Sequence, residues 1–269
     1  GINEPVPMSR VLGRQRASQQ QHLLRLPANN PLIGRKGELI RMNRALEQMR
    51  TSSGQMVRIE GRAGIGKSHL VAEFCARAAQ QDVRVVIGMC QSISQGTSYT
   101  PWRQIFRTLF ALPDEPQNER EATFFATRQI DQVTSHLYNV NPEWLLRLPL
   151  LGDLLDLPIR DNATTAAFEP RLRQEALLAL AVELILNWAR AQPLLLVIEN
   201  AHMMDEPSLR LTQALARAIE RMPALLLLAH RPALNDTQVL LPELSTLPYH
   251  TNFFFNETAT TEIGILVAK

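Results

Sequence analysis

The apolar residues of this chain recur with two different periods. Between residues 39 and 49 they follow roughly helical spacing, at Leu39, Ile40, Met42, Leu46 and Met49. This spacing predicts a helix after a turn at residues 34–35. Segment 56–60 (MVRIE) is then predicted as a short strand, 67–80 (KSHLVAEFCARAAQ) as a helix and 83–90 (VRVVIGMC) as a second strand. Such alternation of strands and helices favours a parallel sheet.

Two nearly uninterrupted aliphatic runs lie in the second half of the chain, LLLVIE at 194–199 and ALLLLAH at 224–230. Central strands of a parallel sheet have this pattern because helices cover both of their faces. Helical segments at about 170–191 and 207–222 precede the two runs, and HTNFFF at 250–255 is expected to be the last strand. The predicted fold is α/β, with three layers around a central parallel sheet of about five strands.

Strand patterns are missing between about residues 101 and 162, where helical pieces such as PWRQIFRTLFAL alternate with prolines. We expect this stretch to be a helical insertion within one domain of residues 30–269. Residues 1–29 are rich in Gln, Arg and Ser without a sustained apolar period, which predicts a linker or arm. The chain starts without methionine, and we expect it to be cut from a longer protein.

Composition narrows the class of protein further. With 269 residues, 45% of them hydrophobic and 20% charged, the chain is expected to be globular. A net charge of +2 without a block of like charges argues against a nucleic-acid partner. The longest apolar stretch, 176–188, contains Glu183 and is too short to span a membrane, so we expect a soluble, cytoplasmic protein. Cys75 and Cys90 lack metal-ligand spacing and are expected to be buried free thiols.

The most specific motif is GRAGIGKS, which matches the pattern G-x-x-x-x-G-K-S between a predicted strand and a predicted helix. The glycines allow backbone N–H groups to surround phosphate oxygens, and the helix presents its positive N-terminal end to the same anion. Lys67 would contact the terminal phosphates, and the Ser68 hydroxyl is placed to bind Mg²⁺. The motif comprises Gly61, Arg62, Ala63, Gly64, Ile65, Gly66, Lys67 and Ser68, and we count His69 with these binding residues.

Glu199 ends the first aliphatic run, where such folds place an acid that faces the metal. The alternative is an acid at a strand end that is exposed to solvent. Asn200 follows it, and an amide can orient a water molecule but cannot accept its proton. Asp205 and Glu206 are expected to cap the next helix rather than to act in catalysis.

Two further residues follow the aliphatic runs. Arg231, after the second run, could reach the γ-phosphate and report its presence, or it could be a surface residue of a loop. His202 is expected to pack or to form a hydrogen bond, and positioning of a water molecule is the other possibility. Tyr99, Trp102 and Phe106 lie in an apolar helical segment, as core residues or as a docking surface.

Six segments resemble, in this order, the AAA-type ATPase module of the STAND signalling NTPases, and most of all the form attached to bacterial class III adenylate/guanylate cyclases. They are NPLIGRKGELIRMNRALEQM, GRAGIGKSHLVAEF, QSISQGTSYTPWRQIFRTLF, EPRLRQEALLALAVELI, PLLLVIENAHMMDEPSL and ALLLLAHRP, within about residues 30–255. The resemblance implies that residues 61–68 surround the phosphates and that four residues border the adenine, namely Leu32, Ile33, Gly34 and Arg35. It also implies that Glu199 faces the metal, that Asn200 replaces a second acid and that Arg231 is the sensor.

This chain departs from the family at two places. Family members commonly carry an acidic pair before the histidine of AHMMDEPS and a tryptophan after it, where this chain has Glu199-Asn200 and Met203. The helical lid that follows in the family is missing from these 269 residues. The opening GINEPVPMSRVLG is similar to the end of a class III cyclase catalytic domain, which implies a cyclase upstream.

From these patterns we expect a regulatory module that binds ATP or ADP with Mg²⁺ and acts as a nucleotide-dependent switch on neighbouring domains, with slow or impaired hydrolysis. The alternative is a degenerate ATPase fold that serves as an interaction scaffold. The sequence is also compatible with a homo-oligomer, in which Arg171 and Arg173 are candidates for an arginine finger supplied to a neighbouring subunit.

Overall fold

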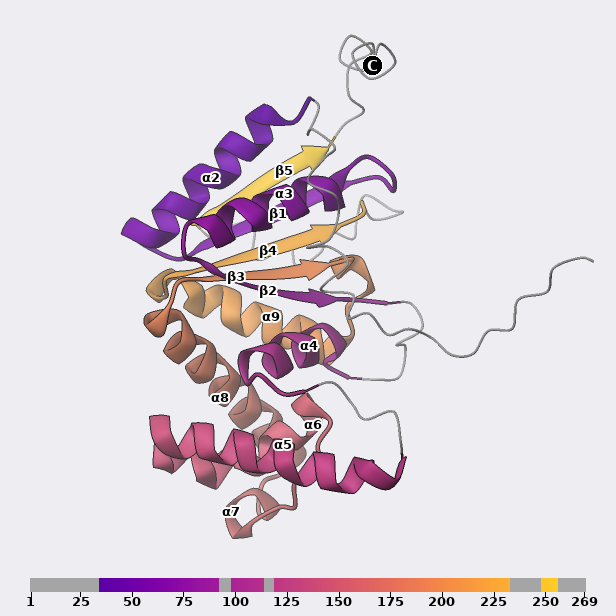
Figure 1. Cartoon of the computed structure of the whole chain (residues 1–269), viewed down its shortest axis with the longest axis vertical. Coiled ribbons are helices and arrows are strands. Elements are labelled where there is room, and N and C mark those ends of the chain that lie inside the picture. Colours follow the sequence, from indigo (N-terminus) through magenta and orange to yellow (C-terminus); the bar gives the residue numbers. More distant parts are fainter. Residues whose placement is uncertain (1–33, 92–97, 114–118, 233–247, 256–269) are drawn as a thin grey trace, which may run out of the picture.

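The computed structural model describes residues 34–91, 98–113, 119–232 and 248–255 (Figure 1). Five parallel strands form one sheet in the order β2-β3-β4-β1-β5, which confirms the predicted parallel sheet. Their carboxyl ends therefore meet at one edge, where ligands bind in open α/β sheets. The strands are β1 (Gln55–Gly61), β2 (Arg84–Met89), β3 (Leu194–Glu199), β4 (Ala224–His230) and β5 (His250–Phe255).

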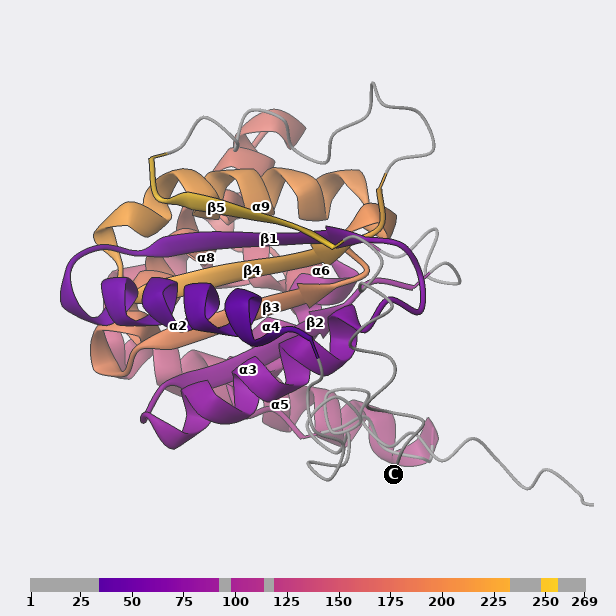
Figure 2. The same cartoon turned by 90° about the horizontal axis from the view of Figure 1, so that it is seen from above.

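Two hydrophobic cores lie on opposite faces of the sheet, and the side chains of β3 alternate between them. Leu195 and Val197 pack in the core under α2 (Lys36–Thr51) and α3 (Lys67–Gln80). Leu194, Leu196 and Ile198 pack in the other core. Figures 1 and 2 show α2 and α3 on one side of the sheet and α8 (Pro170–Ala191) and α9 (Glu206–Ala218) on the other. Coverage of both faces explains the uninterrupted aliphatic run.

The face of α2 agrees with the predicted spacing except at one position. Leu39, Met42, Leu46 and Met49 are buried, whereas Ile40 is 53% exposed. The four buried residues follow steps of three and four along the helix, which keeps them on one stripe, and Ile40 lies beside that stripe. Elsewhere, both cysteines are buried free thiols, as expected.

All elements described between β2 and β3 are helical. They are α4 (Thr100–Leu109), α5 (Glu119–Val140), the 3₁₀ helix η2 (Pro142–Leu150), α6 (Leu151–Leu155), α7 (Ala163–Ala166) and α8. Tyr99, Trp102 and Phe106 belong to the core and do not form a docking surface. The Trp102 indole donates hydrogen bonds to the Ser208 carbonyl (3.1 Å) and the Thr212 hydroxyl (3.0 Å), which joins α4 to α9.

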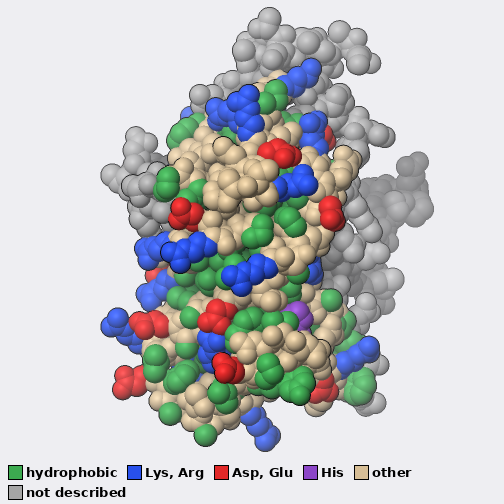
Figure 3. Space-filling model, turned by 90° about the vertical axis from the view of Figure 1, so that its left-hand side faces the viewer, with side chains coloured by type: hydrophobic (Ala, Val, Ile, Leu, Met, Phe, Trp, Pro, Cys, Tyr) green, Lys and Arg blue, Asp and Glu red, His purple; other side chains and the backbone are tan. Residues whose placement is uncertain are grey.

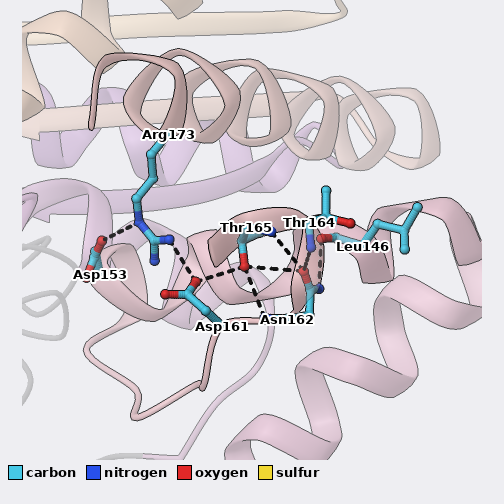
Figure 4. Close-up of polar contacts among 7 residues, drawn as sticks. All are labelled: Leu146, Asp153, Asp161, Asn162, Thr164, Thr165 and Arg173. Atoms are coloured by element: carbon cyan, nitrogen blue, oxygen red, sulfur yellow. Dashed lines mark hydrogen bonds and ion pairs between the residues drawn. The ribbon is translucent and has the colours of Figure 1, made fainter. Parts of the chain in front are cut away.

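A polar junction connects α6, α7 and the start of α8 (Figure 4). Arg173 forms ion pairs with Asp161 (2.7 Å) and Asp153 (3.8 Å), and the Thr165 hydroxyl donates to Asp161 (2.8 Å). Hydrogen bonding by Arg173 lowers the pKa of Asp161. Arg173 is therefore engaged within this chain, and Arg171 of the same helix, although 91% exposed, pairs with Glu175 at 2.9 Å.

Two 3₁₀ helices complete the described secondary structure, η3 (Ala201–Met203) after β3 and η4 (Ile219–Arg221) after α9. Among the helices that the structure describes, none combines the length and the apolar character that crossing a bilayer needs.

Candidate functional site

The loop between β1 and α3 is open and has the backbone that its glycines permit. Gly64 and Gly66 adopt φ values of +77° and +93°, a region that side chains disfavour. A Cβ atom added at either position would meet no atom within 4 Å, so the loop is not packed against other parts of the chain at these two glycines. Helix α3 begins at Lys67, directly after Gly66, so its N-terminal end faces the concave loop. This arrangement suits a phosphate group.

The side chain of Lys67 lies within the loop. Its ammonium group donates hydrogen bonds to the carbonyl oxygens of Gly61 (2.7 Å) and Arg62 (2.8 Å). Burial lowers the pKa of Lys67, while the charge of Glu199 raises it and that of Arg231 lowers it. The structure therefore brings the predicted residues Glu199 and Arg231 within electrostatic reach of Lys67, although the three come from different parts of the sequence.

Glu199 is 3% exposed, so the alternative interpretation, a solvent-exposed acid at the strand end, is wrong. The Ser68 hydroxyl donates to the Oε2 atom of Glu199 (3.4 Å), and the Oε1 atom of Glu199 is buried and has no hydrogen-bond partner among the described residues. Burial raises the pKa of Glu199 to about 7, against the opposing effects of Lys67 and Ser68. A buried carboxylate with one unpaired oxygen beside a hydroxyl fits a hard cation such as Mg²⁺, which prefers oxygen ligands and retains water.

Asn200 follows Glu199 in a left-handed conformation, with φ of +55°. Its carbonyl oxygen accepts the N–H of Met203 (2.9 Å) and so starts η3. Asp205 caps α9, as expected: its Oδ1 atom accepts the N–H of Ser208 (2.9 Å). The same oxygen accepts the N–H of Tyr99 (3.1 Å), which ties the segment after β3 to the start of α4.

Arg231 follows β4 immediately and has an exposed side chain. Its backbone N–H donates to Nδ1 of His202 (3.5 Å), and its carbonyl oxygen lies 2.9 Å from Nδ1 of His230. His202 thus forms a hydrogen bond, as expected. His230 belongs to no motif, and its only signal in the sequence is its place at the end of an aliphatic run beside Arg231.

The residues expected beside the adenine are placed only in part. Leu32 and Ile33 lie outside the described residues. Gly34 has φ of +72° and forms the predicted turn, and Arg35 is 9% exposed and pairs with Glu38 at 3.0 Å. His69 is half-buried in the first turn of α3. Their contact with a nucleotide stays a prediction.

In the described part of the chain, no group of three or more His, Cys, Asp or Glu side chains is placed to hold a metal ion. The pair Ser68 and Glu199 is therefore the candidate cation site, with the phosphates of a nucleotide and water as the remaining ligands.

Glu199 ends β3, which is not the direct neighbour of β1, because β4 lies between the two strands. A glycine loop between a strand and a helix, with an acid at the end of another strand of the same parallel sheet, defines the class of P-loop NTPases. The family model described as "AAA ATPase domain" matches residues 31–228. The chain belongs to this family. No curated protein matches the chain.

Several solved structures are similar to the chain at low sequence identity. The Aeropyrum pernix ORC1 protein in complex with DNA has a TM-score of 0.46 and 13% identity, over 93% of this chain and 52% of that one. Drosophila ORC bound to GC-rich DNA and Cdc6 has a TM-score of 0.43 and 11% identity, over 100% and 38%. VirB4 of Thermoanaerobacter pseudethanolicus has a TM-score of 0.35 and 14% identity, over 82% and 81%. The chain thus spans about half or less of the two origin recognition chains.

The expectation that nucleic acid is not a partner is corrected by this comparison, because two of these structures are complexes with DNA. The physical reason is that a net charge of +2 is an average over the whole chain. Phosphate contacts depend on the local arrangement of basic side chains, which such an average does not describe.

Proposed function

We propose that this chain is a regulatory module that binds ATP with Mg²⁺ and switches the contacts of a multidomain signalling protein according to the state of the nucleotide. In this proposal it belongs to the STAND type, in a protein with a class III cyclase upstream. Residues 61–68 hold the phosphates, Lys67 contacts their terminal oxygens, and Ser68 and Glu199 hold the cation. Mg²⁺, when bound, neutralises charge on the phosphate oxygens.

One observation carries this proposal: the Ser68 hydroxyl lies 3.4 Å from the carboxylate of Glu199, whose other oxygen is buried without a partner in the part of the chain that the structure describes. A buried acid with an unpaired oxygen costs stability unless a ligand compensates it. In the neighbouring loop, a Cβ atom added at Gly64 or Gly66 would meet no atom within 4 Å. In the proposal, this loop takes up the polyphosphate, and the pair of Ser68 and Glu199 takes up its cation.

Slow hydrolysis follows from the residue after Glu199. In the proposed role Glu199 serves the cation, and Asn200, with its amide, cannot take a proton from the attacking water. A general base contributes about 10²- to 10⁴-fold to such a reaction. We therefore propose a weak ATPase that spends most of its time in the nucleotide-bound state.

A route for the switch starts at the same strand end. The segment after Glu199 continues through η3 to Asp205, whose Oδ1 atom accepts the N–H groups of both Ser208 and Tyr99. A change in the position of η3 would therefore reach α4 and the helices behind it. In the proposal, Arg231 distinguishes ATP from ADP by contacting the γ-phosphate.

Calorimetry with ATP, ADP and GTP, with and without Mg²⁺, tests the proposal, followed by a phosphate-release assay. We expect Mg²⁺-dependent binding of ATP and slow release. The substitution Lys67→Ala should weaken ATP binding at least about tenfold, since hydrogen bonds to charged groups contribute about 1.5–3 kcal/mol. Replacing the exposed Lys36→Ala is the matched control. A wild-type protein that binds no nucleotide would contradict the proposal.

A second candidate is the interaction scaffold, and one observation favours it. Large apolar side chains are exposed on the helical elements between β2 and β3: Phe124, Tyr138, Leu146 and Leu172 are 70%, 61%, 58% and 49% exposed. These elements form the lower part of the molecule, where Figure 3 shows apolar side chains at the surface. Exposed apolar surface is typical of interaction sites. In a scaffold, Lys67→Ala would leave partner association unchanged, whereas in a switch the association would depend on nucleotide and be altered by this substitution.

A further inference from the structure

Two imidazole rings contact the backbone of Arg231. His202, from η3, accepts the Arg231 N–H at its Nδ1 atom (3.5 Å). His230, the last residue of β4, has its own Nδ1 atom 2.9 Å from the Arg231 carbonyl oxygen. One residue thus has both of its backbone polar groups bonded to side chains, and these side chains come from the ends of two adjacent strands, β3 and β4.

The two contacts require opposite tautomers of the two rings. A carbonyl oxygen can only accept, so Nδ1 of His230 must carry the proton. An N–H group can only donate, so Nδ1 of His202 must be unprotonated and, in the neutral ring, Nε2 carries the proton. Each ring therefore has a defined protonation pattern that its contact with Arg231 sets.

The surroundings of both rings favour the neutral form. Burial lowers the pKa of His230, with further lowering by the charges of Arg58 and Lys67, and the bond to Arg231 opposes this effect. Burial also lowers the pKa of His202, together with the charges of Arg231, His230 and Lys67. The carboxylate of Glu60 faces Nε2 of His230 at 3.8 Å, beyond hydrogen-bond distance.

We propose that His202 and His230 are positioning residues for Arg231, which fix its peptide groups so that the guanidinium points toward the γ-phosphate. This inference rests on the proposed function and specifies how its sensor is held. Arg231 itself has an exposed side chain, with several rotatable bonds, so a fixed backbone is the means by which the protein limits where its charge lies. Pro232 follows and restricts the chain beyond it.

The proposal also gives η3 a function in the site. His202 lies three residues after Glu199, the candidate cation ligand. A movement of η3 would shift the imidazole that holds the Arg231 N–H. The cation at the end of β3 and the sensor at the end of β4 would then respond together to loss of the γ-phosphate.

The test compares asparagine with glutamine at each position, because an asparagine amide matches the place of Nδ1 and a glutamine amide matches that of Nε2. The measured quantity is the ratio of ATP to ADP affinity, determined by calorimetry on the purified chain with Mg²⁺. We expect His230→Gln and His202→Gln to lower this ratio about threefold to tenfold, the range for loss of one hydrogen bond. His230→Asn and His202→Asn should retain it within about twofold.

A double-substitution cycle with Arg231→Ala shows whether the histidines act through Arg231. If they do, His230→Gln combined with Arg231→Ala should lower the ratio no further than Arg231→Ala alone. Circular dichroism checks that the variants fold, and if the buried His230 tolerates no glutamine, the half-buried His202 provides the same cycle.

The outcomes separate this inference from the proposed function. The positioning role would be overturned, with the switch left intact, if Arg231→Ala reduced the ratio of ATP to ADP affinity and the glutamine variants matched the wild type. It would also be overturned if a glutamine substitution lowered the ratio further in the Arg231→Ala protein. An unchanged ratio in Arg231→Ala would overturn the sensor and its positioning, while ATP binding by the loop would stand. Absence of nucleotide binding in the wild type would overturn the proposed function itself.

Discussion

Replacement of Glu199 by glutamine should stabilise the nucleotide-free protein at neutral and alkaline pH. In the folded chain, burial raises the pKa of this carboxyl group from 4.5 to about 7. At about 1.4 kcal/mol for each pKa unit, the difference corresponds to about 3 kcal/mol. The penalty falls on the ionised form, because the folded environment favours the protonated acid.

The direction with pH follows from the protons bound in each state. Below pH 4.5 the carboxyl group is protonated in both the folded and the unfolded chain, and it contributes nothing. Between pH 4.5 and about 7 the folded chain keeps a proton that the unfolded chain has lost, so stability decreases as the pH rises. Above about pH 7 the group is ionised in both states, and the loss of stability has reached its full size. Glutamine has no charged form, so the variant avoids this loss.

Urea unfolding followed by circular dichroism, in EDTA without nucleotide, measures the effect. We expect the free energy of unfolding of Glu199→Gln, relative to wild type, to increase by about 2 to 3 kcal/mol between pH 5 and pH 8. Glu169→Gln removes an exposed carboxylate whose side chain caps nothing, and it controls for the change in net charge. A relative stability that is constant across this range would refute the reasoning, because it would mean that Glu199 is not buried as the structure describes.

Three further substitutions test single contacts. Asn200→Asp should raise the rate of phosphate release by about tenfold or more, because aspartate supplies a proton acceptor. Aspartate also tolerates the left-handed φ of +55° at this position. A rate equal to that of Asn200→Ala would contradict the proposed cause of slow hydrolysis. Asp205→Ala should destabilise the protein by about 1–2 kcal/mol through loss of the cap, with Asp205→Asn as the milder control in thermal unfolding. Trp102→Ala should cost about 3–5 kcal/mol, and Trp102→Phe less, because the ring is fully buried; equal unfolding midpoints would show that its packing contributes little.

The parts of this fold that could be predicted from the sequence are those that local pattern determines. Helix α3 and strand β3 have the predicted limits, because GRAGIGKS fixes the start of one and a proline precedes the aliphatic run of the other. Ile40 shows where such prediction ends: its spacing is compatible with the buried stripe, but the neighbouring elements decide which edge of the stripe is covered.

The arrangement of the site is harder to predict from the sequence, because its geometry depends on strand order. The aliphatic runs do not reveal that β3 and β4 are neighbours, and only this pairing brings His202 next to Arg231. His230 could not be singled out for the same reason. The burial of Glu199 depends likewise on the helices around the strand end, so its raised pKa could not be predicted from its position in the sequence.

The ammonium group of Lys67 has a consequence for ligand capture. It bonds to the carbonyl oxygens of Gly61 and Arg62, and these two contacts brace the loop from within. A triphosphate that takes up the proposed contact with Lys67 replaces these bonds, whereas the backbone of the loop needs little ordering, which limits the entropy lost on binding. Association should accordingly be largely independent of folding of the loop, and differences between nucleotides should appear in how long each one stays.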